Sequence, residues 1–265
     1  MKKHWFLKPK INTFDHSENG NICWKPLPEE LHRIMKKQLY LSLLALTFLA
    51  GVTFSQKVSS YRHIPEKTPV GFESEINEFL RQDSISFPPA RAWLFTGSST
   101  IRKWDNLKTD FHEIALIHRG FGGSTMEALD YYMDYIVIPY KPFKIIVYEG
   151  DNDLAKGVTP DEFIRQCDTF IKRVHEKLPR TKIYFLAIKP SPSRLKFMPV
   201  QDEANYKLKK LLHKRRNTGF IDIRPLMYDQ SGKIRQDYFE SDMLHITGEC
   251  YKIWADFIKE RLQIR

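Results

Sequence analysis

Short apolar runs alternate with longer segments of helical periodicity over most of this chain, and this alternation limits its fold more than any other feature. Five runs are predicted as strands, at residues 92–95, 114–117, 145–148, 183–188 and 220–223. Helical patterns lie at residues 72–81, 125–138, 160–178, 200–215 and 247–262. Strands that alternate with helices form a parallel sheet covered on both faces. We therefore predict an α/β fold, a flavodoxin-like three-layer α/β/α sandwich around a central parallel sheet of about five strands.

Reactive side chains cluster where the predicted strands end. The segments are Gly97-Ser98-Ser99-Thr100, His118-Arg119-Gly120-Phe121-Gly122-Gly123-Ser124-Thr125 and Glu149-Gly150-Asp151-Asn152-Asp153, together with Asp242-Met243-Leu244-His245 just before the last helix. In open parallel sheets, sites form at the carboxyl ends of the strands. We expect these four segments to meet at one edge of the sheet.

Each segment alone also has a purely structural interpretation. Ser98 or Thr100 is a suitable helix cap, residues 150–153 suit a turn, and Asp242 or His245 suits the start of the last helix. Together, however, the segments supply complementary chemistry. Serine is a nucleophile, histidine its base, and aspartate the group that orients histidine. Glycine N–H groups and an asparagine amide are donors for an oxyanion.

These four segments resemble the motifs of the SGNH (GDSL-type) hydrolase superfamily of esterases and acylhydrolases. The resemblance runs from about Trp93 to Trp254 and implies the fold of that superfamily. The family's first motif, Gly-Asp-Ser-Leu, corresponds to Gly97-Ser98-Ser99-Thr100, so the resemblance assigns the nucleophile to Ser99. Ser98 replaces the usual aspartate and is a minor rival.

The resemblance implies the remaining site residues as well. His245 is the base and Asp242 orients it. The backbone N–H groups of Ser99 and Gly123 and the Asn152 side chain form the oxyanion hole. No metal or organic cofactor is expected. Arg119 and Asp153 are expected to be structural supports. The loop at residues 190–198 is expected to line the mouth of the site, where Arg194 either meets an acidic substrate or is an ordinary surface arginine.

The function implied is that of a serine esterase or acylhydrolase that forms an acyl-serine intermediate. Because the segments at the strand ends are short and no long apolar insertion follows them, we expect short acyl groups on carbohydrate as its substrates. One alternative is a lysophospholipase or lipase-like hydrolase. Another is a non-catalytic surface module that binds glycan or lipid. A nucleotide- or flavin-binding protein with a phosphate loop at residues 120–123 is disfavoured, because the loop lacks Gly-x-Gly-x-x-Gly spacing.

The N-terminal part predicts export. Lys36 and Lys37 precede an apolar run at residues 39–54, short for a membrane span, and small residues precede Gln56. We expect residues 35–55 to be a signal peptide cleaved after Ser55, or a signal anchor. Residues 1–34 are then an over-extended N-terminus or a cytoplasmic tail. Residues 56–90 are a lead-in segment and residues 91–265 the hydrolase domain, placed in the periplasm or outside the cell.

Composition narrows the expected partners. The 265 residues carry a formal charge of +10, but the one dense basic run, residues 207–216, fits a solvated helix face. We therefore expect a small-molecule or glycan ester as partner, no nucleic acid, and possible membrane attachment through residues 39–54. Cys23, Cys167 and Cys250 have neither metal-site spacing nor an evident disulfide pattern. Nothing in the sequence predicts an oligomeric state.

Overall fold

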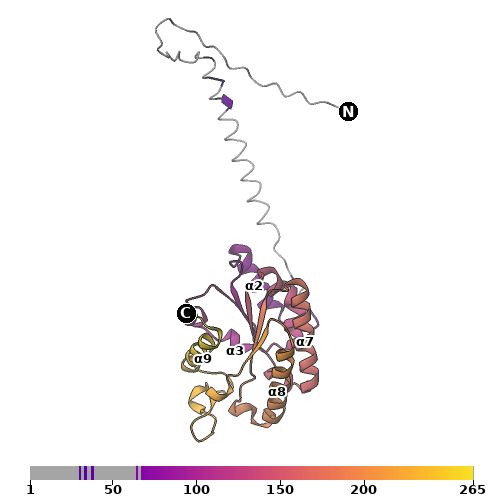
Figure 1. Cartoon of the computed structure of the whole chain (residues 1–265), viewed down its shortest axis with the longest axis vertical. Helices are drawn as coiled ribbons and strands as arrows, with labels where there is room; N and C mark the ends of the chain where they lie inside the picture. The colour runs from indigo at the N-terminus through magenta and orange to yellow at the C-terminus, as the bar shows by residue number, and fades with distance from the viewer. Residues whose placement is uncertain (1–29, 31–32, 35–36, 39–63, 65–66, 265) are drawn as a thin grey trace. The chain divides into compact units, whose positions relative to one another are not determined.

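A computed structural model of the chain describes residues 30, 33–34, 37–38, 64 and 67–264 (Figure 1). The chain divides into two compact units, Met1–Ser59 and Ser60–Arg265. In the first unit the described residues are helical and exposed. The expected signal peptide or anchor at 35–55, its apolar run at 39–54 and Cys23 lie outside the described residues, apart from Lys37 and Gln38. Within the part of the chain that is described, we find no helix with the length and apolar character needed to cross a bilayer.

A five-stranded parallel sheet forms the centre of the second unit, as predicted. Its strands are β1 (Trp93–Gly97), β2 (Leu116–Gly120), β3 (Lys144–Tyr148), β4 (Lys182–Leu186) and β5 (Thr218–Ile221). They are ordered β2-β1-β3-β4-β5. The register pairs Gly97 with both Gly120 and Tyr148, so β1, β2 and β3 end at the same level. The segments after these strands therefore meet at one edge.

Helices cover both faces of the sheet and give the predicted three layers (Figure 1). One face packs against α2 (Glu73–Ile85), α5 (Met126–Ile136), α7 (Pro160–Lys177) and α8 (Met198–Lys214). The other packs against α3 (Ser99–Arg102), α4 (Leu107–Asp110) and α9 (Gly248–Leu262). The remaining helical segments are α6 (Asp151–Ala155) and the 3₁₀ turns η1 (Ile138–Tyr140), η2 (Pro192–Phe197), η3 (Arg224–Met227) and η4 (Gln236–Tyr238).

The alternation of side chains along each strand divides the hydrophobic core into two layers, one on each face of the sheet. Leu94 of β1 lies in the cluster under α5 and α7, whereas its neighbours Trp93 and Phe95 lie in the cluster under α9. Successive strand residues point to opposite faces, so a strand buried on both sides is apolar throughout. This explains why the strands appear in the sequence as continuous apolar runs.

Local capping signals set several helix starts. The Thr159 hydroxyl accepts a hydrogen bond from Glu162 N–H at 3.2 Å, and Pro160 occupies the first turn of α7, as predicted. Thr247 caps α9 in the same way, so neither Asp242 nor His245 caps that helix. The expected cap at Ser98 is wrong, because its side chain makes no capping hydrogen bond to α3. A helix of only four residues is stabilised mainly by its packing against the rest of the protein, and a cap contributes less.

Candidate active site

Ser99 stands at the first position of α3, directly after a turn that requires glycine. Gly97 has φ +124°, and a Cβ there would lie 2.1 Å from the Tyr148 carbonyl oxygen. The close approach of β1 and β3 thus excludes any side chain at this position. Thr100, the next residue of α3, accepts a hydrogen bond through its carbonyl from the Tyr251 hydroxyl of α9 at 2.8 Å. This bond holds α3 against the helix that follows His245.

The two adjacent serines have different surroundings. Ser98 is 2% exposed, and its backbone N–H donates to the Tyr148 carbonyl at 3.0 Å. Ser99 is half-buried, and its Oγ lies 2.8 Å from His245 Nε2. Of the two serines, Ser99 is therefore the one in contact with the histidine.

Asp242 and His245 are joined by a compact turn between η4 and α9. Asp242 Oδ1 accepts the backbone N–H groups of Leu244 and His245, both at 2.9 Å, and Oδ2 lies 2.5 Å from His245 Nδ1. A carboxylate can only accept here, so Nδ1 carries the proton. His245 Nε2 is then left as the acceptor for the Ser99 hydroxyl.

The charge of Asp242 suits this arrangement. Burial raises the pKa of Asp242, but the hydrogen bonds from His245 and Leu244 outweigh it and hold that pKa well below its ordinary value. The carboxylate is consequently ionised at neutral pH and keeps the imidazole ring in one tautomer and one orientation.

Backbone and amide donors lie on the neighbouring strand ends. Gly123, in the turn between β2 and α5, has φ +80°, a conformation that favours glycine. In the described part of the chain, the backbone N–H groups of Gly123 and Ser99 donate no hydrogen bond. Asn152 Nδ2 donates to the Ser124 carbonyl at 3.0 Å, which places the amide beside the Gly123 turn. The Ser99 and Gly123 N–H groups are free, and the Asn152 amide is positioned, to donate hydrogen bonds to an oxygen that develops negative charge.

Two buried carboxyl groups hold the β2 and β3 ends together. Asp153 accepts from Met126 N–H at 2.8 Å and from Gly150 N–H at 3.0 Å, while burial raises the pKa of Asp153 to about 6. Glu149 accepts from the Ser124 hydroxyl at 2.6 Å, and burial followed by repulsion from Asp153 raises the pKa of Glu149 well above its ordinary value. Asp153 thus has the supporting position expected for it.

The Arg119 side chain also has a structural role, because its guanidinium is bound by neighbouring side chains. Its guanidinium forms a buried ion pair with Asp83 and donates to the Tyr140 hydroxyl at 2.8 Å. These contacts tie β2 to α2 and η1, and they leave the Arg119 guanidinium bound away from Ser99 and His245.

Lys189 is a buried charged residue that sequence reasoning missed. It is fully buried, and its Nζ lies 3.2 Å from Asp151 Oδ2, 3.3 Å from the Tyr148 hydroxyl and 3.5 Å from Thr100 Oγ1. Burial lowers the pKa of Lys189, but Tyr148 and Asp151 more than offset this, so its pKa lies above the ordinary value. Its position directly after the apolar run at 183–188 could have predicted this burial, and a buried lysine needs a charged partner.

One group of side chains also has the composition of a cation site. Glu240, Asp242 and His245 offer ligand atoms within 4.8 Å of one another. However, Glu240 pairs with Lys103 at 2.5 Å, and both nitrogens of the His245 ring are engaged by Asp242 and Ser99. These contacts therefore fit a hydrogen-bonded Ser99–His245–Asp242 triad better than a metal site.

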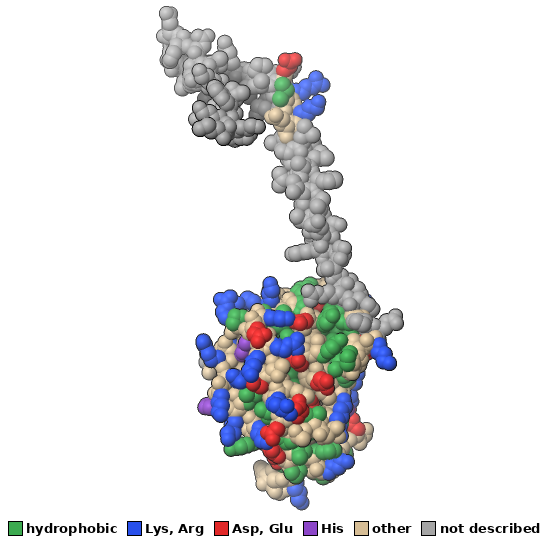
Figure 2. Space-filling view, turned by 90° about the vertical axis from the view of Figure 1, so that its right-hand side faces the viewer, with side chains coloured by type: hydrophobic (Ala, Val, Ile, Leu, Met, Phe, Trp, Pro, Cys, Tyr) green, Lys and Arg blue, Asp and Glu red, His purple; other side chains and the backbone are tan. Residues whose placement is uncertain are grey.

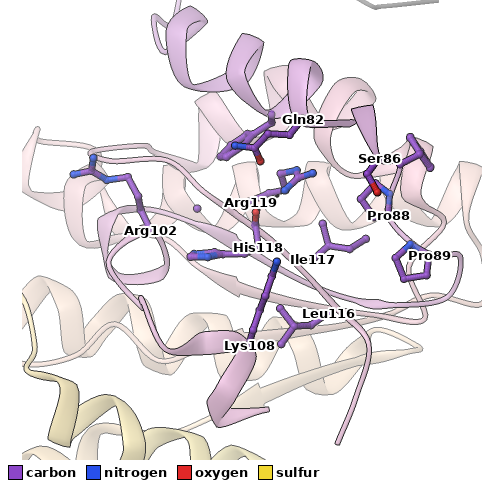
Figure 3. Close-up of a pocket in the computed structure, with 13 residues that line it drawn as sticks. Gln82, Ser86, Pro88, Pro89, Arg102, Lys108, Leu116, Ile117, His118 and Arg119 are labelled. Atoms are coloured by element: carbon purple, nitrogen blue, oxygen red, sulfur yellow. Dashed lines mark hydrogen bonds between the residues drawn. The ribbon is translucent and has the colours of Figure 1, made fainter. Parts of the chain in front are cut away.

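A cavity of about 570 Å³ lies along the outer edge of β2 (Figure 3). Its wall includes Lys108, His118 and Arg119 with an apolar end at Pro88 and Pro89, and Lys108 extends towards the strand. None of the expected site residues lines this cavity. The cavity and the serine–histidine pair are therefore separate features.

Comparisons with known proteins agree with this geometry. A family model described as GDSL-like Lipase/Acylhydrolase family matches residues 83–253. Comparison with curated protein sequences gave no match.

Solved structures share the fold. A GDSL-like lipase from Bacteroides thetaiotaomicron is 17% identical with a TM-score of 0.60, over 71% of this chain and 97% of that one. A catalytic mutant of an acetylxylan esterase from Geobacillus stearothermophilus is 14% identical with a TM-score of 0.55, over 67% of this chain and 96% of that one. At such identities the likeness concerns the fold.

Proposed function

The chain belongs to the GDSL-like lipase/acylhydrolase family, and from that premise we propose that it is a serine esterase that removes short acyl groups from carbohydrates. The observation that carries the proposal is the 2.8 Å distance between Ser99 Oγ and His245 Nε2, with Asp242 on the other ring nitrogen. A hydroxyl, a base and an orienting carboxylate in contact form an activated nucleophile.

In the proposed reaction, His245 Nε2 takes the Ser99 proton as Ser99 Oγ attacks the ester carbonyl carbon. The tetrahedral intermediate carries its negative charge on the former carbonyl oxygen. Ser99 N–H, Gly123 N–H and the Asn152 amide are the donors proposed for that oxygen. His245 then returns the proton to the leaving alcohol, which leaves an acyl group on Ser99.

Water completes the cycle by the same steps. His245 removes a proton from the water molecule as the water oxygen attacks the acyl-Ser99 carbonyl. The bond to Ser99 Oγ then breaks as His245 returns this proton to Ser99 Oγ, which releases the carboxylic acid and restores the serine hydroxyl. Asp242 stabilises the imidazolium that forms in both halves, because it stays ionised below its ordinary titration range.

The short-acyl, carbohydrate assignment is supported by two observations. The connections after β1, β2 and β3 are short, and none carries an apolar insertion of the kind that covers a fatty chain. A fold neighbour is an acetylxylan esterase. The lipase-like alternative predicts instead a rate that rises with acyl length.

Ester turnover by matched serine variants tests the proposal. With 4-nitrophenyl acetate, Ser99→Ala is expected to lose activity by a factor of roughly 10⁴ or more. Ser98→Ala is the matched control, one residue away, and is expected to remain active. Loss of activity in the Ser98 variant alone would move the nucleophile to Ser98. Absence of turnover by the wild-type chain on all esters would instead support a non-catalytic binding module.

A further inference from the structure

The carboxylate of Asp151 is shared by two cations. Asp151 is 5% exposed and immediately precedes Asn152. Lys189 Nζ lies 3.2 Å from its Oδ2, and Arg194 Nε lies 3.5 Å from its Oδ1. Among the described residues, neither cation forms an ion pair with any other carboxylate. Two positive charges against one negative charge leave a surplus positive charge in a poorly solvated place.

Three buried polar atoms of the segment at residues 191–201 have no hydrogen-bond partner in the described part of the chain. They are Ser191 Oγ, Arg194 Nε and Gln201 Oε1, and Gln201 Nε2 lies 3.5 Å from Asp151 Oδ1. Unsatisfied buried polar atoms cost free energy, so a cluster of them marks a place for a polar ligand or water. Arg194 is the member that reaches solvent, since its side chain is 25% exposed.

Arg194 and the residues beside it lie near three of the four segments of the proposed active site. Ser193 N–H donates to the carbonyl of Met243, inside the turn that joins Asp242 to His245, at 3.0 Å. Asp151, which Arg194 contacts, is the neighbour of Asn152. Lys189, the second cation on Asp151, reaches Thr100, the neighbour of Ser99, at 3.5 Å. The surplus charge is therefore at the rim of the Ser99 site.

We propose that Arg194, with the Ser191 hydroxyl, binds an anionic group on the alcohol part of the ester substrate, so that the enzyme prefers acyl esters of charged sugars. This proposal rests on the esterase function proposed above. The ligand group is a carboxylate or a phosphate, because a guanidinium presents a planar pair of donors that matches either one. Lys189 neutralises Asp151, which frees the Arg194 charge for the substrate.

A matched set of sugar esters tests this subsite in the full chain. The substrates are methyl glucoside, methyl glucuronoside and methyl glucoside 6-phosphate, each acetylated at the same hydroxyl, and the readout is acetate release. We expect kcat/KM for at least one charged ester to exceed that of the neutral ester by roughly tenfold, the value of one hydrogen-bonded charged contact. The better of the two charged esters identifies the group.

Variants of the arginine make the test specific. Arg194→Gln is expected to abolish the charged-to-neutral preference, mainly through a higher KM for the charged ester, while Arg194→Lys keeps part of it. Arg180→Gln removes the same charge from an exposed position before β4, at the opposite edge of the sheet, and is expected to keep the full preference.

Two results would overturn the subsite. One is equal kcat/KM, or no turnover, for all three sugar esters by a wild-type chain that cleaves 4-nitrophenyl acetate. The other is an unchanged preference in Arg194→Gln. Failure to cleave even 4-nitrophenyl acetate would refute the esterase function itself, and that outcome is distinct from both.

Discussion

At the residue scale, backbone geometry separates two serines that composition cannot distinguish. Gly97 ends β1 with a positive φ, a backbone conformation that favours glycine. Ser98, the next residue, is buried, whereas Ser99 is the first residue of α3 and lies beside His245. A single-residue shift in this turn would exchange their surroundings. The position of the Ser99 hydroxyl, which we propose as the nucleophile, thus depends on the tight approach of Gly97 to Tyr148.

Asn152 provides the residue-scale prediction. Its amide lies beside the Gly123 turn through the bond to Ser124, where it can donate to an oxyanion. We expect Asn152→Ala to lower kcat by roughly 10²–10³, or about 2.7–4 kcal/mol, as found for loss of a side-chain oxyanion donor. KM is expected to change little, because this hydrogen bond strengthens as charge develops.

Steady-state kinetics on 4-nitrophenyl acetate measure both constants. Asn106→Ala is a suitable control, since Asn106 is exposed and makes no side-chain cap before α4. A rise in KM with unchanged kcat would mean that Asn152 binds the substrate and does not stabilise the oxyanion.

At the element scale, the junction between β3 and α5 is held by buried acids. Glu149 directly follows β3 and accepts from the Ser124 hydroxyl, and Asp153 accepts from the backbone N–H of Met126, the first residue of α5. Glu149 Oε2 is buried without a partner in the described chain. An ionised carboxylate in this position is costly, so the junction favours the neutral acid.

Glu149 should make folding stability depend on pH. Its pKa is raised above 4.5 in the folded protein, so the folded state binds this proton more tightly than the unfolded chain does. The contribution of Glu149 to the free energy of unfolding is therefore fully present below the pKa of the unfolded chain. It declines as the pH rises towards the pKa of the folded state, by roughly 1.4 kcal/mol per pH unit. Glu149→Gln resembles the neutral acid and removes this contribution.

Thermal unfolding at about pH 5 and about pH 8 checks the prediction. The fall in Tm between these conditions is expected to be smaller in Glu149→Gln than in the wild type, by about 2–4 °C for each kcal/mol removed. Glu127→Gln makes the same change at an exposed position of α5 and should behave like the wild type. Equal pH dependence in all three proteins would show that Glu149 ionises normally.

At the scale of the whole molecule, the surface and the loops indicate what the site can accommodate. Lys, Arg, Asp and Glu side chains are interspersed on the face seen in Figure 2. In the loop after β4, Leu195 is an exposed large apolar side chain. A long acyl chain needs a continuous apolar channel, and the short connections after β1, β2 and β3 add no apolar segment to the site, which supports the proposed preference for short acyl groups.

The dependence of kcat/KM on acyl length tests the proposed preference for short acyl groups. Each CH₂ that leaves water contributes about 0.8 kcal/mol, about fourfold in kcat/KM. For 4-nitrophenyl acetate, butyrate, octanoate and palmitate, we expect the highest kcat/KM with the short acyl groups, after subtraction of the Ser99→Ala background. A steady rise towards palmitate would favour the lipase or lysophospholipase alternative.

Local signals in the sequence were sufficient for the layers and for most of the elements. Apolar runs and helical periodicity predicted the five strands and the long helices, because burial of a face imposes a period that neighbouring residues carry. Boundaries moved by a few residues: the second strand, expected at residues 114–117, runs from Leu116 to Gly120. The motif resemblance also named the residues that the fold gathers at the sheet edge.

Tertiary structure alone decided which of these groups touch. Ser99 and His245 are 146 residues apart in the chain, and their 2.8 Å contact depends on how α3 packs against α9. The same holds for Asp151, which meets Lys189 and Arg194 only because α6 and the loop after β4 end at the same edge. Sequence periodicity encodes which residues are buried, but charge balance in a buried site depends on distances between segments, and those exist only once the chain has folded.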